Sequence, residues 1–237
     1  MRKLFVTRRL PLSAAVAFVA LCFCLPAAAQ KGGGARTQPA PAKKLSVGGN
    51  APGAGRVVGA NYVNDFFGFQ LTIPTGWRIA DEDAARKIDQ QGADLVAGDS
   101  AERRARLRAA ASKNINLITM GTIIMAGGAG ESALLIVGAE AIPAWLIKTP
   151  QEYMGQARRL LESSAMPVQV AAGTRSETIG GMEFAVIDVS SEQASGTIRQ
   201  HYYATLKKGY ALFFISTYGG DLSEKAIEDV LKSVKFK

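Results

Sequence analysis

Acidic, basic and hydroxyl side chains alternate along two stretches in the last quarter of the chain. A four-residue loop at 192–195 would pair Asp188 with Arg199 across a hairpin. A three-residue loop at 207–209 would place His201 opposite Ile215 in the next hairpin. One face of the sheet would then carry the side chains of Asp188, Arg199, His201, Tyr203 and Thr217. An acid, a base and a hydroxyl on one face could form a catalytic or ligand-binding site.

The same face also has a purely structural interpretation. Opposite charges paired across antiparallel strands are an ordinary source of sheet stability. With Val186 and Ile215 as neighbours, the His201 ring would be half-buried, neutral and structural. A Ser-His-Asp triad would have to use His201, and the chain has no G-x-S-x-G motif to supply the nucleophile. We therefore expect binding residues on this face and no catalytic residue.

A separate candidate is Trp145, in the apolar segment Ile142-Pro143-Ala144-Trp145-Leu146-Ile147. Its side chain could be an exposed anchor for a partner protein. The alternative is that the segment folds back onto the core of its own domain.

The composition excludes several kinds of site. His201 is the only histidine, and the two cysteines, Cys22 and Cys24, lie near the N-terminus. A zinc cluster of Cys and His, a disulfide framework and any site with two histidines are ruled out. The glycine run at 32–34 is not followed by Lys-Ser or Lys-Thr, so it is not a phosphate-binding loop. We expect neither a metal nor a cofactor.

The elements that would position these residues alternate between strands and helices. Apolar residues at helical spacing predict three long helices, beginning near Asp81, Thr149 and Ser223. A short solvated helix that carries four arginines is expected over 101–111. Strands are expected over 66–74, 115–120, 132–139, 182–191, 196–206 and 210–217. The last of these strands is apolar on both faces, so helices must cover both sides of the sheet. The prediction is an α+β fold, an α/β/α sandwich with a mainly antiparallel central sheet.

The N-terminus has the order of a secretory signal. A basic segment over 1–9 precedes an uncharged stretch over 10–25, and small residues at 27–29 predict cleavage after Ala29. An uncleaved membrane anchor is the alternative, although the stretch is short for a span. Residues 30–60 are rich in Gly, Ala and Pro, which predicts a flexible basic linker. Residues 61–237 would then form a single globular domain.

The net charge of +8 is concentrated outside that domain. Residues 1–60 hold nine basic side chains and no acid, which leaves 19 basic against 20 acidic side chains in 61–237. The domain is therefore nearly neutral, and we expect no nucleic-acid partner.

Two segments are similar to a known family. Phe67-Gly68-Phe69-Gln70-Leu71-Thr72-Ile73-Pro74-Thr75-Gly76-Trp77 resembles the opening motif of the PsbP-like superfamily, and Gly196–Phe236 resembles its ending. The superfamily includes extrinsic photosystem II proteins and bacterial envelope proteins of the DcrB type, which this chain resembles most. The resemblance implies an antiparallel sheet between helices and a non-catalytic binding or assembly module. The glycine-rich loop and the basic linker depart from the family pattern.

Three functions follow as expectations. The first is an exported, non-catalytic binding or assembly module in the periplasm or outside the cell. Its partner would be another envelope protein, and no membrane span would remain after signal cleavage. The second is a carrier of a small ligand or lipid, with a pocket between sheet and helix. The third is an enzyme that uses Asp188 and His201.

Overall fold

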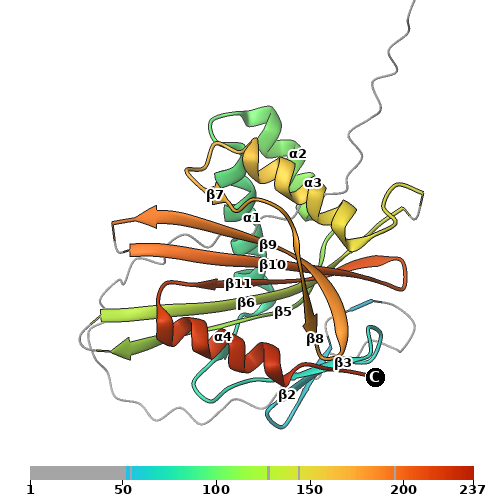
Figure 1. Cartoon of the computed structure of the whole chain (residues 1–237), viewed down its shortest axis with the longest axis vertical. Coiled ribbons are helices and arrows are strands. Elements are labelled where there is room, and N and C mark those ends of the chain that lie inside the picture. Colours follow the sequence, from blue (N-terminus) through green and yellow to red (C-terminus); the bar gives the residue numbers. More distant parts are fainter. Residues whose placement is uncertain (1–51, 54, 127–128, 144, 195) are drawn as a thin grey trace, which may run out of the picture.

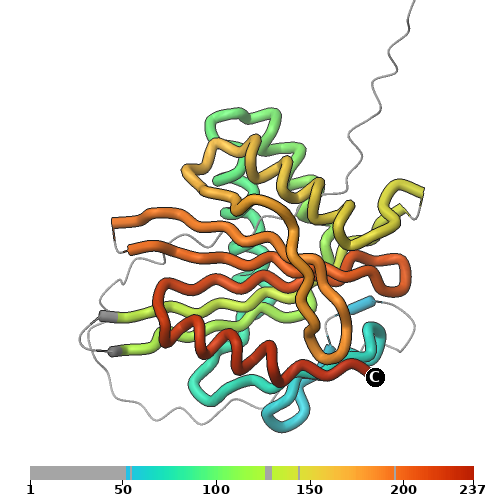
Figure 2. Tube along the Cα trace, viewed as in Figure 1, coloured from blue at the N-terminus to red at the C-terminus, as the bar shows by residue number. Residues whose placement is uncertain are grey.

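The computed structural model describes residues 52–237 apart from 54, 127–128, 144 and 195 (Figures 1 and 2). The predicted signal peptide and most of the predicted linker lie outside the described residues. Those residues form a mixed α+β fold with two antiparallel sheets. The elements are β1 (Arg56–Val58), β2 (Asn61–Asn64), β3 (Phe69–Thr72), β4 (Arg78–Ile79), α1 (Glu82–Ala97), α2 (Ala101–Ala111), β5 (Ile115–Ala126), β6 (Ala129–Ala141), α3 (Pro150–Glu162), β7 (Gln169–Val170), β8 (Arg175–Ile179), β9 (Met182–Gln193), β10 (Gly196–Lys207), β11 (Tyr210–Tyr218), α4 (Asp221–Ser233) and β12 (Lys235–Phe236).

The large sheet has the strand order β4-β5-β6-β11-β10-β9-β7, with β8 paired to β9 beside β7. Its central strands are apolar on both faces, as their sequences indicated. One face packs against α4 and the small sheet, with Phe214 and Val186 on the strands and Ile227 on the helix. We call this the α4 face. The opposite face packs against α3 and α1, and its buried residues include Phe213 and Tyr202. In Figure 1, α4 lies in front of the large sheet and α1 behind it.

The small sheet has the order β1-β2-β3-β12 and joins segments from both ends of the domain. Phe236 of β12 pairs with Phe69 of β3, and its ring lies 6.1 Å from that of Phe184 in the large sheet. The predicted linker does not extend to residue 60, because Arg56–Val58 pairs with β2. The alternating pattern at 66–74 predicted a strand, but its first residues form the turn before β3.

Helix starts follow the capping rules with one exception. Asp81 and Thr149 are N-caps, as predicted, and each accepts a hydrogen bond from the backbone N–H of the third residue of its helix. The last helix begins at Asp221 and not after Ser223. Ser223 is buried in its first turn, where its hydroxyl accepts from the Gly220 N–H at 3.0 Å. The prediction correctly named the capping side chain but placed it at the wrong position.

Strands β5 and β6 are longer than expected. The segment 121–131 was predicted as a loop, whereas its ends continue both strands. Glu131 lies on β6 in this extension, and its Oε2 accepts the Ser223 N–H at 2.9 Å. A carboxylate at a helix N-terminus is electrostatically favourable, so Glu131 ties the hairpin to α4. Among the described residues, no helix has the length and apolar character needed to cross a membrane.

Candidate functional site

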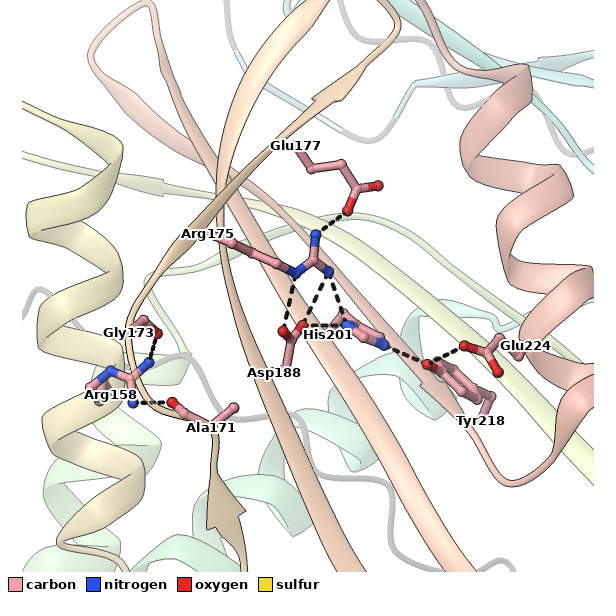
Figure 3. A network of polar contacts seen from close by, with 9 residues as sticks. All are labelled: Arg158, Ala171, Gly173, Arg175, Glu177, Asp188, His201, Tyr218 and Glu224. Carbon is pink, nitrogen blue, oxygen red and sulfur yellow. Dashed lines mark hydrogen bonds and ion pairs between the residues drawn. The ribbon is translucent and has the colours of Figure 1, made fainter.

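A groove of about 520 Å³ lies on the α4 face of the large sheet, between β8 and α4. Tyrosine and histidine side chains of β10 and β11 form its floor, and charged residues line both walls. Its lining consists of Arg175, Glu177, Thr178, Ile179, Gly180, His201, Tyr203, Tyr218, Glu224, Ile227, Glu228, Leu231 and Lys232. Figure 3 shows the polar network at this site, from Glu177 on one wall to Glu224 on the other.

The wall formed by β8 is held in place from the α3 side. Arg158 of α3 donates hydrogen bonds to the carbonyl oxygens of Ala171, at 2.5 Å, and Gly173 (Figure 3). Its side chain is 17% exposed, so these bonds are partly shielded from water. The residues it fixes come immediately before β8. Arg158 is therefore a positioning residue for Arg175.

Arg175 and Asp188 form the centre of the network. The Arg175 guanidinium donates to Asp188 Oδ2 from Nε at 3.0 Å and to Oδ1 from Nη2 at 3.1 Å. Such a two-pronged contact fixes both groups in orientation as well as in position. Arg175 also donates to Glu177 on its own strand. Arg175 is thus shared between two carboxylates at the edge of the groove.

His201 continues the network toward the helix. Its Nδ1 lies 2.5 Å from Asp188 Oδ1, and its Nε2 lies 2.5 Å from the hydroxyl of Tyr218. Tyr218 in turn donates to Glu224 Oε1 at 3.0 Å. The single hydrogen of Tyr218 cannot satisfy both His201 and Glu224. Because Tyr218 donates to Glu224, its oxygen is left to accept from Nε2 of His201, while Nδ1 lies between Asp188 Oδ1 and Arg175 Nη2, which is 3.2 Å away.

The charges in the groove shift the pKa values of its acids in different directions. Burial raises the pKa of Asp188, but hydrogen bonds from Arg175 and His201 outweigh it and hold that pKa below its usual value. Burial and the nearby Glu224 carboxylate raise the pKa of Tyr218. Burial and the charge of Glu177 raise that of Tyr203. Asp188 is therefore a fixed anion, and both phenols stay protonated.

The predicted partner of Asp188 was wrong by a shift of two residues. Gln193 pairs with Gly196, which leaves a two-residue loop in place of the expected four. Asp188 consequently lies opposite His201, and Arg199 lies opposite Ser190. A shift of two keeps every side chain on its face. Arg199 therefore shares the α4 face with His201 but does not form the predicted ion pair.

The predicted register of the second hairpin, β10 with β11, was wrong by one residue. This error has a larger effect on the site than the shift of two. Lys208 and Gly209 both have positive φ, 54° and 81°, as a two-residue type I′ turn requires. Lys207 therefore pairs with Tyr210, and His201 lies opposite Ser216 in place of Ile215. A shift of one moves a side chain to the other face.

The two neighbouring residues of β11 show the result. Thr217, expected beside His201, lies on the α3 side, where its hydroxyl accepts from Gln200 at 2.9 Å. Tyr218 takes its place next to His201, and the two rings stack at a centroid distance of 5.4 Å. The predicted position of His201 between two aliphatic residues is wrong, because its ring nitrogens contact Asp188 and Tyr218.

The remaining predicted residues fall in two places. Tyr203 lies in the floor of the groove, with its ring centroid 6.1 Å from that of His201. Trp145 is 72% exposed and does not line the groove. The Trp145 side chain is exposed, but the segment that carries it does fold back onto the core, because Ile147 is buried and Ile142 and Leu146 pack beside it. The role of Trp145 as an anchor for a partner stays a prediction.

Arg175 and Glu177 were missed because no strand was predicted between the helix that begins near Thr149 and residue 182. A signal was available, since Arg175, Glu177 and Ile179 alternate with Ser and Thr before the pair Gly180-Gly181. Two glycines between alternating runs are typical of a tight hairpin. In the part of the chain that the structure describes, no three His, Cys, Asp or Glu side chains gather to hold a metal ion.

Comparisons with known proteins find similarity in structure but not in sequence. No protein family and no curated protein matches the chain. A crystal structure from Bacteroides thetaiotaomicron VPI-5482 aligns with 76% of this chain and 48% of its own length, at 9% identity and a TM-score of 0.42. LpqN, involved in cell envelope biogenesis of Mycobacterium tuberculosis, aligns over 71% and 83%, at 12% identity and a TM-score of 0.40. The cyanobacterial PsbP (CyanoP) from Synechocystis sp. PCC 6803 aligns over 81% and 98%, at 13% identity and a TM-score of 0.43.

One of these structures is a PsbP, the superfamily that the opening motif resembles. Neither of the two named proteins is of the DcrB type, so that part of the resemblance stays a prediction. At these TM-scores the likeness carries no inference about activity. The proposals below are built on the geometry of this chain.

Proposed function

We propose that the chain is an exported, non-catalytic binding module of the cell envelope, and that the groove between β8 and α4 is its binding site. The observation that carries the proposal is a groove of about 520 Å³ with a polar floor and charged walls. Ligand sites commonly fall in this range of volume and place a few fixed polar groups among apolar ones. Ile179, Ile227 and Leu231 supply the apolar part, and the Arg175–Asp188–His201 network supplies the fixed polar part.

The chemistry of the network supports binding over catalysis. A general base needs an accessible lone pair, whereas both ring nitrogens of His201 are engaged, by Asp188 and by Tyr218. The Tyr218 hydroxyl is a poor nucleophile, because its pKa is raised, which disfavours the phenolate. Asp188 is fully occupied by Arg175 and His201. These groups are arranged to hold one another in position, so we propose that the protein is not an enzyme.

The location and the domain organisation belong to the same proposal. A signal peptide over 1–29 would export the chain to the periplasm or the medium. A basic linker would lead from residue 30 to a single globular domain, and the partner would be another envelope protein. The large sheet between α4 and the α1 and α3 pair would form an α/β/α sandwich of the PsbP-like type. The two faces of that sheet, each with its own cluster of buried residues, support this arrangement.

Photo-crosslinking tests whether the groove binds a partner. A photoreactive phenylalanine is placed at Thr178 on β8 or at Lys232 on α4, both exposed positions in the groove lining. The matched control position is Arg106, exposed on α2. Irradiation of intact cells that produce the full chain should give the same discrete protein adduct from both groove positions and none from position 106.

Two results would contradict the proposal. Equal adducts from position 106 would mean that capture is non-specific. No adduct from either groove position, in cells where the protein is exported and folded, would mean that the groove takes no protein.

A small-ligand carrier is the second candidate, favoured by the size of the same groove. Native mass spectrometry of the full chain purified from its host would detect a bound compound. The variant Tyr203→Leu should lose that compound, because the substitution changes the floor of the groove, whereas Arg106→Gln should keep it. A compound retained by both variants would lie outside the groove.

A further inference from the structure

Four lysines surround the β12 edge of the small sheet. Lys235 lies on β12 and Lys237 follows it, while Lys207 and Lys208 reach this edge from the turn between β10 and β11. Lys207 Nζ lies 4.7 Å from the centroid of the Phe236 ring. Lys208 Nζ lies 5.0 Å from that of Phe66 and donates to the Phe66 carbonyl oxygen at 2.6 Å. We call these four residues the lysine edge.

The lysine edge has little negative charge to balance it. Among the described residues, none of the four ammonium groups forms an ion pair with a carboxylate. The nearby Asp65 is held by Arg56, although the charge of Lys237 also lowers its pKa. Partial burial and the charge of Lys208 together lower the pKa of Lys207. Positive charges held together without a counter-ion favour the approach of an anionic partner.

Trp145 lies on the same side of the molecule. The segment that carries it is tied to the β10–β11 turn, because the Ile142 N–H donates to the Gly209 carbonyl oxygen at 3.1 Å. In Figure 1 this segment, the turn and the C-terminal end all lie on the right-hand side of the molecule. Trp145 is 72% exposed, which leaves a large apolar ring in solvent. Exposed valines at 57 and 58 extend the apolar surface along β1, at the far edge of the small sheet.

We propose that the lysine edge and Trp145 form a docking surface for an anionic phospholipid membrane. Lysine ammonium groups bind anionic headgroups, and tryptophan favours the boundary between headgroups and acyl chains. After cleavage behind Ala29, residues 30–55, which lead into β1, add four basic side chains and no acid, so further positive charge is attached to the same small sheet. The proposal is independent of what the groove binds, because neither Trp145 nor any residue of the lysine edge lines the groove.

A membrane fits these features better than an acidic protein does. A protein partner would cover an exposed tryptophan in a shaped pocket and pair individual lysines with individual carboxylates. The lysine edge and Trp145 are instead carried by separate segments, the lysines by the end of β10, the turn after it and the C-terminal residues, and Trp145 by the segment between β6 and α3. A fluid layer of headgroups can contact both regions at once without a matching shape.

Fluorescence quenching by lipid provides the test. The full chain has two tryptophans, so the variant Trp77→Phe leaves Trp145 as the only fluorescent indole. It is mixed with vesicles of phosphatidylcholine and phosphatidylglycerol whose acyl chains are brominated, and with vesicles of phosphatidylcholine alone. Trp145 should be quenched by the anionic vesicles only, and the quenching should weaken as salt is added. If Trp77→Phe unfolds the domain, the same signal is obtained as the difference between the native chain and Trp145→Phe.

Charge variants identify the surface. Lys208→Asn with Lys235→Gln should weaken vesicle binding about fivefold for each lysine removed. The matched control removes two exposed lysines elsewhere, Lys87→Gln with Lys113→Gln, and should bind as the parent does. Residues 1–51 are the same in every variant, so their contribution cancels. Absence of quenching, equal quenching by neutral vesicles, or equal weakening in the control pair would overturn the proposal.

Discussion

His201 and Glu140 are polar residues on opposite faces of the large sheet, and their surroundings differ. His201 is 20% exposed and has a partner at each ring nitrogen. Glu140 is 3% exposed and has one partner, the hydroxyl of Tyr153, which donates to Oε2 at 2.8 Å. Its Oε1 has no partner among the described residues. Burial therefore raises the pKa of Glu140 to about 7, since only one hydrogen bond stabilises the anion.

This carboxyl makes stability depend on pH. The folded-state pKa of about 7 lies above the ordinary value of 4.5, so the folded state holds its proton more tightly than the unfolded chain does. The free energy of unfolding should fall by roughly 2–3 kcal/mol as pH rises from 4.5 to about 7. It should stay constant above that pH. Urea unfolding across this range measures it. Asp89, whose pKa burial raises to about 6, contributes in the same direction at lower pH.

The variant Glu140→Gln should remove most of this slope and keep the part due to Asp89. The exposed Glu82→Gln is the matched control and should leave the slope unchanged. An unchanged slope in Glu140→Gln would show that Glu140 does not hold its proton in the fold.

Arg175 stabilises the groove by its shape as well as its charge. Arg175→Lys keeps the charge but cannot contact both oxygens of Asp188 and also Glu177. We expect a loss of about 1 kcal/mol in the free energy of unfolding, because Arg175 is 42% exposed and solvent screens its ion pairs. Arg106→Lys, in an exposed helical pair with Glu102, should cost less than about 0.5 kcal/mol. Equal losses in the two variants would mean that the contacts to Asp188 add nothing.

At the scale of elements, close packing between strands depends on one glycine in β6. A Cβ atom on Gly138 would lie 2.2 Å from Phe213 Cζ and 3.0 Å from the Ile115 carbonyl oxygen. Gly138→Ala should therefore cost about 2 kcal/mol or more in urea unfolding, as overpacked cores do. Adding Phe213→Leu should recover part of the loss, because the smaller side chain makes room for the methyl group. Additive losses in the double variant would rule out the contact as the cause.

The sequence predicted most of the elements because their signals are local. Apolar spacing located α1 and α3, and Thr149 with Pro150 gave the start of α3 correctly. The central strands were also located, because each is a run of residues that is apolar on both faces. Such a strand must be covered on both faces, so helices were expected on either side of the sheet. The short strands β4, β7 and β12 carry two residues each, too few for any periodic pattern.

The candidate site was predicted less well because it depends on register, which turn length sets. A loop misjudged by two residues left Asp188, Arg199 and His201 on one face and changed only their partners. A loop misjudged by one residue put Thr217 in the place of Tyr218. Lys208 has a positive φ, which lysine rarely adopts, so its sequence gave no sign of the two-residue turn. Arg175 entered the site through β8, a strand that the pattern analysis did not assign.

At the scale of the whole molecule, the domain begins before residue 61. The Gly55 N–H donates to the Tyr62 hydroxyl at 2.9 Å, and Asn64 Nδ2 donates to the Gly53 carbonyl oxygen at 3.0 Å. A chain that starts at residue 52 should unfold at the same urea midpoint as the full chain. A chain that starts at residue 61 loses β1 and these bonds, and should be less stable by about 1–2 kcal/mol. Equal urea midpoints for the two truncated chains would mean that residues 52–60 belong to the linker and do not stabilise the domain.

Export gives a prediction that mass spectrometry can check. The intact mass of the exported protein should correspond to a chain that starts at Gln30, with or without cyclisation of that residue to pyroglutamate. A mass that includes Cys22 would contradict cleavage after Ala29. Residues 1–29 lie outside the described structure, so this prediction rests on the sequence alone.

The small sheet has a consequence for the order in which the chain folds. Phe69 and Phe236 are paired neighbours although almost the whole domain separates them in sequence. Strand β3 therefore emerges early during synthesis and stays without its β12 partner until residues 235–236 have been made. Contacts this distant in sequence are slow to form, because the loop between them must close first. Throughout that time the nascent chain exposes Phe67, Phe69 and Leu71, all of them fully buried in the folded domain, to whatever chaperones bind unfolded chains.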